Sequence, residues 1–140
     1  MFTRVLRVSV AVHDLDAAVA SYEALGLVPV AEVKESPRGF GLRWVELGEP
    51  GGGCLVELLT PTREDSPVAR FLACHGEGVY QVRLGTQSLA EALDVLVKRG
   101  VRVIRDTGRP TGARPLGWIH PRSTHGVLME LVQESGEEGQ

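Results

Sequence analysis

A short apolar phrase with a glutamate in its middle occurs twice in this chain. The first copy spans residues 54–59 and is centred on Glu57, and the second spans residues 126–132 and is centred on Glu130. Each copy has the length and composition of a buried strand. An isolated charge inside such a strand is very costly, so each carboxylate must be solvated, paired with a cation or bound to a metal. The pattern predicts a duplicated unit whose two carboxylates face one site.

The spacing of other residues supports an internal repeat. The two central glutamates are 73 positions apart. An offset of 74 relates three further pairs, in a predicted helix, at its end and in a predicted strand: Leu15 and Leu89, Gly26 and Gly100, Trp44 and Trp118. An offset held this closely across several elements indicates that one structural unit is present twice.

Hydrophobic periodicity predicts the order strand, helix, strand, strand, strand in both halves. The first half has a helix that Asp14 caps and Gly26 ends, with strands at 5–12, 27–33, 40–47 and 54–59. The second half has a helix that Ser88 and Glu91 open, with strands at 79–84, 101–104, 116–120 and 126–132. We therefore predict an α+β fold in one domain, 1–133, with repeats at about 4–60 and 78–133, a linker at 61–77 that holds a short helix, and an acidic, disordered tail at 134–140.

Composition excludes several classes of protein. The 140 residues are 43% hydrophobic and 24% charged, which is typical of a globular domain. The net charge of -3 gives no electrostatic footprint for nucleic acid, and no apolar run is long enough for a membrane span or a signal peptide. Cys54 and Cys74 lack a metal-binding spacing, which favours reduced thiols. We expect a cytoplasmic protein, forming a homodimer, whose partner is a small-molecule ligand.

Four stretches, at 10–15, 57–61, 65–72 and 120–133, carry a resemblance to a known family. With the two βαβββ repeats, the chain resembles the vicinal oxygen chelate superfamily, which includes glyoxalase I, extradiol dioxygenases and bleomycin-resistance proteins, and within it the methylmalonyl-CoA epimerases. The resemblance implies that each unit is a curled mixed sheet around part of a cavity. It also implies chemistry in which a divalent metal polarises a thioester carbonyl while acid/base groups move the α-proton.

In that family a histidine on the first strand and a Glu or Gln on the last strand of each unit hold the metal. Here the last-strand positions are Glu57 and Glu130, but the histidine positions are Arg7 and Gln81. Arginine stays protonated and has no acceptor, so it cannot ligate a cation. The family's third-strand base falls near Leu42, which cannot transfer a proton. We therefore predict a degenerate metal site and no cofactor; a divalent metal bound through Glu57, Gln81 and Glu130 is disfavoured, because a glutamine oxygen is a weak ligand.

Strand alternation and the resemblance together assign eight residues to the ligand cavity: Arg7, Ser9, Glu57, Gln81, Arg83, Trp118, His120 and Glu130. Their charges, two positive and two negative, can balance through guanidinium–carboxylate hydrogen bonds. We interpret the cavity floor as a metal-free ion-pair network in which Arg7 is the counter-ion of both Glu57 and Glu130. Such a network can equally be structural only. No catalytic residue is assigned; the candidates are Glu57, Glu130 and, as an acid/base group, His120.

Two classes of function stay open. The first is a cavity protein that binds a small organic, acyl-CoA-like molecule without a metal, or with metal-independent chemistry. The second is an epimerase-like isomerase or glyoxalase-like lyase with an altered metal site. The loss of both histidine ligands favours the first class, while the family stretches keep an acyl-CoA-like ligand in view.

Overall fold

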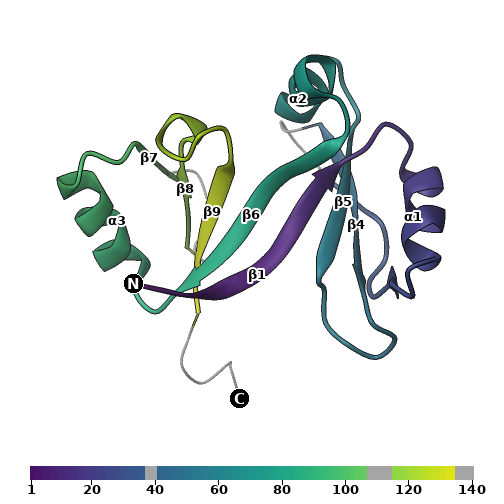
Figure 1. Ribbon diagram of the computed structural model, residues 1–140, viewed down its shortest axis with the longest axis horizontal. Helices are drawn as coiled ribbons and strands as arrows, with labels where there is room; N and C mark the ends of the chain where they lie inside the picture. The colour runs from purple at the N-terminus through teal and green to yellow at the C-terminus, as the bar shows by residue number, and fades with distance from the viewer. Residues whose placement is uncertain (37–40, 107–114, 135–140) are drawn as a thin grey trace. The chain divides into compact units, whose positions relative to one another are not determined.

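The computed structural model describes residues 1–36, 41–106 and 115–134 and contains two compact units (Figure 1). The first unit is Arg7–Tyr80, and the second combines Met1–Leu6 with Gln81–Gln140. These units do not coincide with the sequence repeats, because the start of the first strand belongs to the second unit and the linker helix belongs to the first. Each unit mixes helices with a sheet, so the predicted α+β class is confirmed.

The first unit contains a mixed sheet. Its elements are β1 (Phe2–Ala11, from residue 7 onward), α1 (Leu15–Glu23), β2 (Val28–Pro29), β3 (Lys34–Glu35), β4 (Leu42–Gly48), β5 (Val56–Pro61) and α2 (Pro67–His75). Strand β5 runs parallel to β1 and antiparallel to β4, and β4 also pairs with the short strands β2 and β3. The predicted strand 27–33 is wrong as one element. Pro29 has no N–H to donate and Val33 is half-exposed, so the ladder is interrupted there.

Local signals set the ends of both helices in this unit. The Asp14 carboxylate accepts a hydrogen bond from the backbone N–H of Ala17 at 3.0 Å, as predicted for an N-cap. The Ser66 hydroxyl caps α2 in the same way, with a 3.0 Å bond from the N–H of Ala69. After α1 the chain turns at Gly26, whose φ of 90° suits a residue without a Cβ.

The two faces of the first sheet differ in what covers them. Helix α1 packs over one face, where a cluster of buried side chains forms the core: Val12, Leu15, Val45, Leu47 and Leu58. Helix α2 covers one end of the opposite face, where it buries a second cluster: Ala11, Leu59, Val68 and Leu72. The rest of that face carries polar side chains. Neither apolar cluster extends over this polar end of the sheet.

The second unit repeats the arrangement. Its elements are β6 (Gly78–Thr86, from residue 81 onward), α3 (Leu89–Lys98), β7 (Val103–Arg105), β8 (Leu116–Ile119), the 3₁₀ turn η1 (Pro121–Ser123) and β9 (Leu128–Gln133). Strand β9 is parallel to β6 and antiparallel to β8, which pairs with β7. Helix α3 packs its apolar stripe on one face with Ile119 and Leu131. Residues 107–114, between the predicted strands 101–104 and 116–120, and most of the predicted disordered tail, 134–140, lie outside the described residues.

The strand order confirms the two predicted βαβββ units. In each, the first strand pairs in parallel with the last strand, which pairs antiparallel with the strand before it. The two units differ by two residues in the register between the last strand and the strand before it. Glu46 lies opposite Glu57 in the first unit, whereas Trp118 lies opposite Glu130 in the second. The repeats therefore present different side chains to their equivalent glutamates.

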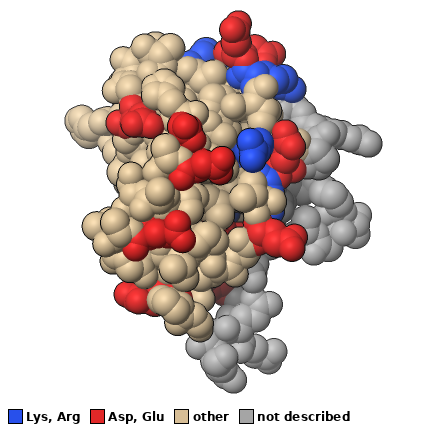
Figure 2. Space-filling view, turned by 90° about the vertical axis from the view of Figure 1, so that its right-hand side faces the viewer, with Lys and Arg blue, Asp and Glu red and all other residues tan. Residues whose placement is uncertain are grey.

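None of the helices in the described ranges is both long and apolar enough to cross a membrane. On the face shown in Figure 2, acidic side chains are scattered and no continuous basic patch is visible.

Candidate functional site

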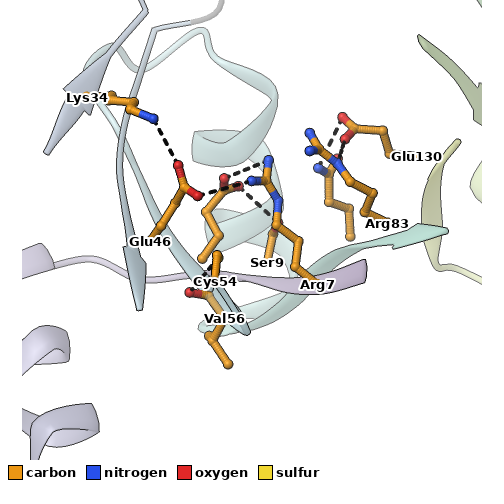
Figure 3. A network of polar contacts seen from close by, with 10 residues as sticks. Arg7, Ser9, Lys34, Glu46, Cys54, Val56, Arg83 and Glu130 are labelled. Carbon is orange, nitrogen blue, oxygen red and sulfur yellow. Dashed lines mark hydrogen bonds and ion pairs between the residues drawn. The ribbon is translucent and has the colours of Figure 1, made fainter. Parts of the chain in front are cut away.

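Glu57 is the centre of a polar network in the first unit. Glu57 is only 4% exposed, yet both of its carboxylate oxygens have partners. Oε2 lies 2.9 Å from Nη2 of Arg7, and Oε1 accepts a hydrogen bond from the Ser9 hydroxyl at 3.0 Å (Figure 3). Ser9 lies directly opposite Glu57 in the β1–β5 ladder, and Arg7 is two residues earlier on the same face of β1. The predicted pair between Arg7 and Glu57 is confirmed.

A second carboxylate, that of Glu46, extends this network. Glu46 lies opposite Glu57 in the β4–β5 ladder, where two like charges alone would destabilise the sheet. Nη1 of Arg7 lies 3.7 Å from Glu46, and Nζ of Lys34 lies 2.9 Å from the other oxygen of Glu46 (Figure 3). Arg7 therefore bridges two glutamates, and its Nε is buried without a hydrogen-bond partner among the described residues.

Glu46 and Lys34 are not among the residues that the sequence predicts for this site. A signal for Glu46 exists in the alternation of β4, where Val45 and Leu47 face the α1 core. Alternation then places Glu46 on the opposite face, together with Trp44. Lys34 gives no such signal, because it belongs to a two-residue strand whose pairing with β4 the sequence pattern does not predict.

The charges of the first network shift two pKa values. Burial acts to raise the pKa of Glu46, but Lys34 and then Arg7 outweigh it and hold the pKa below its usual range. Burial, followed by the negative charge of Glu46, raises the pKa of the Cys54 thiol. The thiol also donates a 3.5 Å hydrogen bond to the carbonyl of Val56 (Figure 3). Cys54 is thus held in its protonated form, which is a poor nucleophile and a poor metal ligand.

Glu130 is the centre of a separate network in the second unit. It is 6% exposed and forms an ion pair with Nε of Arg83, which lies opposite it in the β6–β9 ladder (Figure 3). The amide of Gln81 donates a longer hydrogen bond of 3.4 Å to its other oxygen. Cross-strand pairing within the unit therefore brings Arg83 directly opposite Glu130 as its cation, whereas the predicted pairing of Arg7 with Glu130 joins the two units and stays a prediction.

The two networks are built on equivalent strands, but the arginine is at a different position in each. By the offset of 74, Arg7 corresponds to Gln81 and Ser9 corresponds to Arg83. Each glutamate is therefore engaged by one guanidinium and one neutral polar side chain from the neighbouring strand. In the first unit the arginine is at the earlier of the two equivalent positions, as Arg7, and in the second unit it is at the later one, as Arg83. Each buried carboxylate is balanced within its own unit.

Trp118 and His120 lie beside the second network. Trp118 is opposite Glu130 in the β8–β9 ladder and is only partly buried. His120 follows β8 directly, and alternation assigns it to the same face as Trp118. Diagonal neighbours in such a ladder are about 7–8 Å apart, which is the separation expected between His120 and Glu130. The face thus combines a buried ion pair with two partly exposed rings.

The ring of His120 is held in one tautomer. Its Nδ1 accepts a 3.0 Å hydrogen bond from the backbone N–H of Arg122 and so caps the turn η1. A nitrogen that accepts carries no proton, so the neutral ring carries its proton on Nε2. His120 can therefore present a hydrogen-bond donor without carrying a charge.

Two surface hollows lie away from these networks. One, of about 480 Å³, is lined by the first residues of the chain and by α3, and another, of about 400 Å³, by the start of α1 with Arg43 and Thr60. Neither hollow includes any of the eight predicted cavity residues. Because neither brings together a buried carboxylate and its cation, we take the polar strand faces as the candidate site.

Comparison with known proteins gives one consistent result. Residues 7–117 match the model of the glyoxalase/bleomycin resistance protein/dioxygenase superfamily. The chain is 32% identical over 137 residues to the ethylmalonyl-CoA/methylmalonyl-CoA epimerase of Cereibacter sphaeroides, covering 95% of this chain and 99% of that protein. It is 33% identical over 134 residues to the mitochondrial methylmalonyl-CoA epimerase of Mus musculus, covering 93% of this chain and 72% of that protein.

Solved structures agree. The methylmalonyl-CoA epimerase of Mycobacterium tuberculosis has a TM-score of 0.80 at 31% identity, with 99% of this chain and 92% of that chain covered. A variant of the Streptomyces coelicolor methylmalonyl-CoA epimerase in complex with 2-nitronate-propionyl-CoA has a TM-score of 0.78 at 37% identity, with 97% of each chain covered.

Proposed function

The chain belongs to the glyoxalase/bleomycin resistance protein/dioxygenase superfamily, and we propose that it binds an acyl-CoA thioester and exchanges the proton on the carbon next to the thioester carbonyl, without a metal ion. This is an epimerase-type reaction and takes up the second of the two functions that the sequence leaves open. Support comes from the full-length similarity to methylmalonyl-CoA epimerases, one of which has been solved with 2-nitronate-propionyl-CoA. The observation that carries the proposal is the buried Glu130–Arg83 pair beside Trp118 and His120.

The residues at the family's metal positions do not fit a divalent cation. Glu57 and Glu130 each lie against a guanidinium, and Arg7 has no lone pair to offer a metal. Within the described ranges no group of three or more His, Cys, Asp or Glu side chains is arranged to hold a metal. Hard or borderline cations need several such donors, so we assign the positive charge at the site to arginine instead.

The proposed chemistry needs a base and a stabilised oxygen. The carboxylate of Glu130 accepts the α-proton, the C–H electron pair forms a C=C bond, and the carbonyl π electrons move to the thioester oxygen. Return of a proton to the same carbon restores the thioester, so atoms and electrons balance without a co-reactant. Donors aimed at the oxygen where charge develops supply much of the rate in such reactions.

His120 and Arg83 are the donors that we assign to that oxygen. The Nε2–H of His120 can donate while the ring stays neutral, because Nδ1 is already occupied by the Arg122 N–H. A neutral imidazole donor of this kind polarises carbonyl groups in known isomerase chemistry. Arg83 also provides the positive charge opposite the buried Glu130 carboxylate. In the first unit we assign a structural role to Arg7, which holds Glu46 and Glu57 together.

A second candidate function is binding of the thioester without reaction. The specific observation in its favour is that both buried glutamates are engaged by arginines, while Leu42 stands near the place of the family's base. A carboxylate that stays bound to its guanidinium is a weaker base. Binding would survive under this alternative, whereas proton exchange would not.

The test combines calorimetry with proton NMR. Propionyl-CoA and free CoA are titrated into the purified chain, and loss of the α-proton signal of propionyl-CoA is then followed in D₂O containing a chelator. We expect tighter binding of the thioester than of CoA, and α-deuteration that Arg83→Met abolishes. Asp94→Asn, which alters an exposed ion pair with Arg105, is the matched control and should retain both. Binding without deuteration would establish the second candidate, and absence of thioester binding would overturn both.

A further inference from the structure

We infer that Gln81 is a positioning residue whose amide holds Glu130 both before and after Oε2 of that carboxyl group takes the α-proton. The inference rests on the proposed function, because it concerns the base of that same site. The three residues that carry it, Gln81, Arg83 and Glu130, all belong to the second unit.

The two carboxylate oxygens of Glu130 have unequal partners. Oε1 is ion-paired with Nε of Arg83, which lies directly opposite Glu130 in the β6–β9 ladder (Figure 3). Oε2 accepts a hydrogen bond of 3.4 Å from the Gln81 amide, longer than the usual range of about 2.7–3.2 Å. Because Oε1 is already engaged by a guanidinium, Oε2 is the oxygen that is more available to a proton.

The first unit provides an internal comparison, since its glutamate has the structural role. There Oε2 of Glu57 lies 2.9 Å from Arg7, and Oε1 accepts a 3.0 Å hydrogen bond from Ser9. By the offset of 74, Arg7 is the residue that corresponds to Gln81. The position next to the reacting glutamate therefore has a neutral amide where the position next to the structural glutamate has a fixed cation.

An amide and a guanidinium differ in the hydrogen bonds that they can make. A guanidinium has donors only, whereas the side chain of Gln81 has two N–H donors and a carbonyl acceptor. An ionised carboxylate only accepts hydrogen bonds, but a protonated carboxyl group also donates one through its O–H. The partner of a carboxyl group that gains and loses a proton must therefore be able to donate in one state and accept in the other.

Gln81 meets this requirement. Before the reaction, its Nε2–H group donates to Oε2 of Glu130. Once Oε2 has taken the α-proton, the new O–H donates to the amide oxygen of Gln81 after the amide turns about its last side-chain bond. That bond turns readily, because its torsion has a broad, roughly two-fold preference. Return of the proton to carbon restores the first arrangement, so the amide is unchanged over the cycle.

Burial makes this support important. Gln81 is 8% exposed and Glu130 is 6% exposed, so neither side chain can readily exchange its partner for bulk water. A polar group that is left unpaired in such a place is costly, and the carboxyl group would turn away from its working position. Displacement of a reacting group by about 1 Å can slow a reaction by about 100-fold. Loss of the Gln81 amide should therefore lower the rate of proton exchange more than it weakens binding of the thioester.

Replacement of Gln81 by methionine tests the need for the amide. Methionine has a similar length but neither the N–H donors nor the carbonyl. Calorimetry gives the dissociation constant of propionyl-CoA, and α-deuteration in D₂O with a chelator gives the rate at saturating thioester. We expect Gln81→Met to bind propionyl-CoA as wild type does and to exchange its α-proton about 10–100-fold more slowly. The matched control is Gln87→Met, the same change at an exposed residue, which should retain both binding and rate.

Replacement by arginine separates simple holding from the exchange of donor and acceptor. Gln81→Arg gives the second unit the residue that the first unit has at this position, and its guanidinium still donates to Oε2. A residue that only held Glu130 in place would be replaced well by arginine. We expect Gln81→Arg to lose the rate as strongly as Gln81→Met, because arginine cannot accept from the protonated carboxyl group.

The outcomes distinguish the inference from the proposed function. A wild-type rate at saturation in either folded Gln81 variant, or a loss explained entirely by weaker binding, would overturn the inference and leave the proposed function in place. If Gln81→Met fails to fold, Gln81→Arg decides the question. Absence of α-deuteration in the wild-type protein would overturn the proposed function, and the inference with it.

Discussion

Replacement of Arg7 by methionine should destabilise the protein strongly at neutral pH. The substitution keeps an unbranched side chain but leaves Glu57, which is 4% exposed, without its guanidinium. Removal of one partner from a buried ion pair costs about 3–5 kcal/mol. We expect the lower end, about 3 kcal/mol, because the Arg7 side chain is 16% exposed and Glu46 keeps its contact with Lys34. In a domain of this size that corresponds to a fall in Tm of about 10 °C.

The loss should depend on pH in a defined direction. The pKa of Glu46 is lower in the folded protein, so its contribution to stability is complete above the unfolded pKa and is lost as pH falls through the folded value. Arg7 supports Glu46 and Glu57 only while they are ionised. The difference between wild type and Arg7→Met should therefore be largest near pH 7 and should shrink below about pH 4.3, the usual glutamate pKa. Urea melts followed by circular dichroism at a series of pH values measure it.

A matched control separates burial from loss of a charge. Arg105 pairs with Asp94 at 3.4 Å, but both side chains are about half-exposed or more, at 48% and 68%. Exposed pairs contribute about 0–1 kcal/mol, so Arg105→Met should have little effect at any pH. If Arg7→Met costs no more stability than Arg105→Met, or costs the same at pH 7 and below pH 4, then Arg7 is not the counter-ion of these buried glutamates.

Three further predictions concern single side chains. Glu46→Gln should make the acid part of the stability profile shallower, because it removes a carboxylate whose pKa is lowered on folding; an unchanged slope in urea melts would contradict this. His120→Asn and His120→Ala should both slow α-deuteration by about 10–100-fold, but only the alanine variant should lose about 1 kcal/mol, since asparagine still caps η1. Iodoacetamide at pH 8 should modify Cys54 slowly, and Glu46→Gln should accelerate the reaction, since the charge of Glu46 contributes to the raised pKa of the thiol; equal rates in both proteins would refute that contribution.

The repeated architecture could be predicted because its signals are local. Strand alternation, the Asp14 and Ser88 caps and the glycine ends are set by nearby residues, and the offset of 74 carries them into the second half. The ion pair of Arg7 with Glu57 could also be predicted, since parallel pairing of the first and last strands of a unit brings the two side chains to one face.

The rest depended on cross-strand register, which no local pattern determines. The position of Glu46 opposite Glu57 is set by the pairing of β4 with β5, and the pairing of β8 with β9 places Trp118 there in the second unit. A shift of two residues preserves alternation, so the sequence gives no sign of it. The pairing of Arg83 with Glu130 was missed for the same reason, because it is set by direct opposition in the β6–β9 ladder.

The charge that polarises the thioester can be tested directly. The protein is stripped of metal with a chelator, and the rate of α-deuteration of propionyl-CoA is measured before and after addition of cobalt(II). We expect equal rates in the two conditions, with loss of the reaction in Arg83→Met under both. A rate that is absent from the stripped protein and returns only with cobalt would show that a metal, not arginine, polarises the thioester.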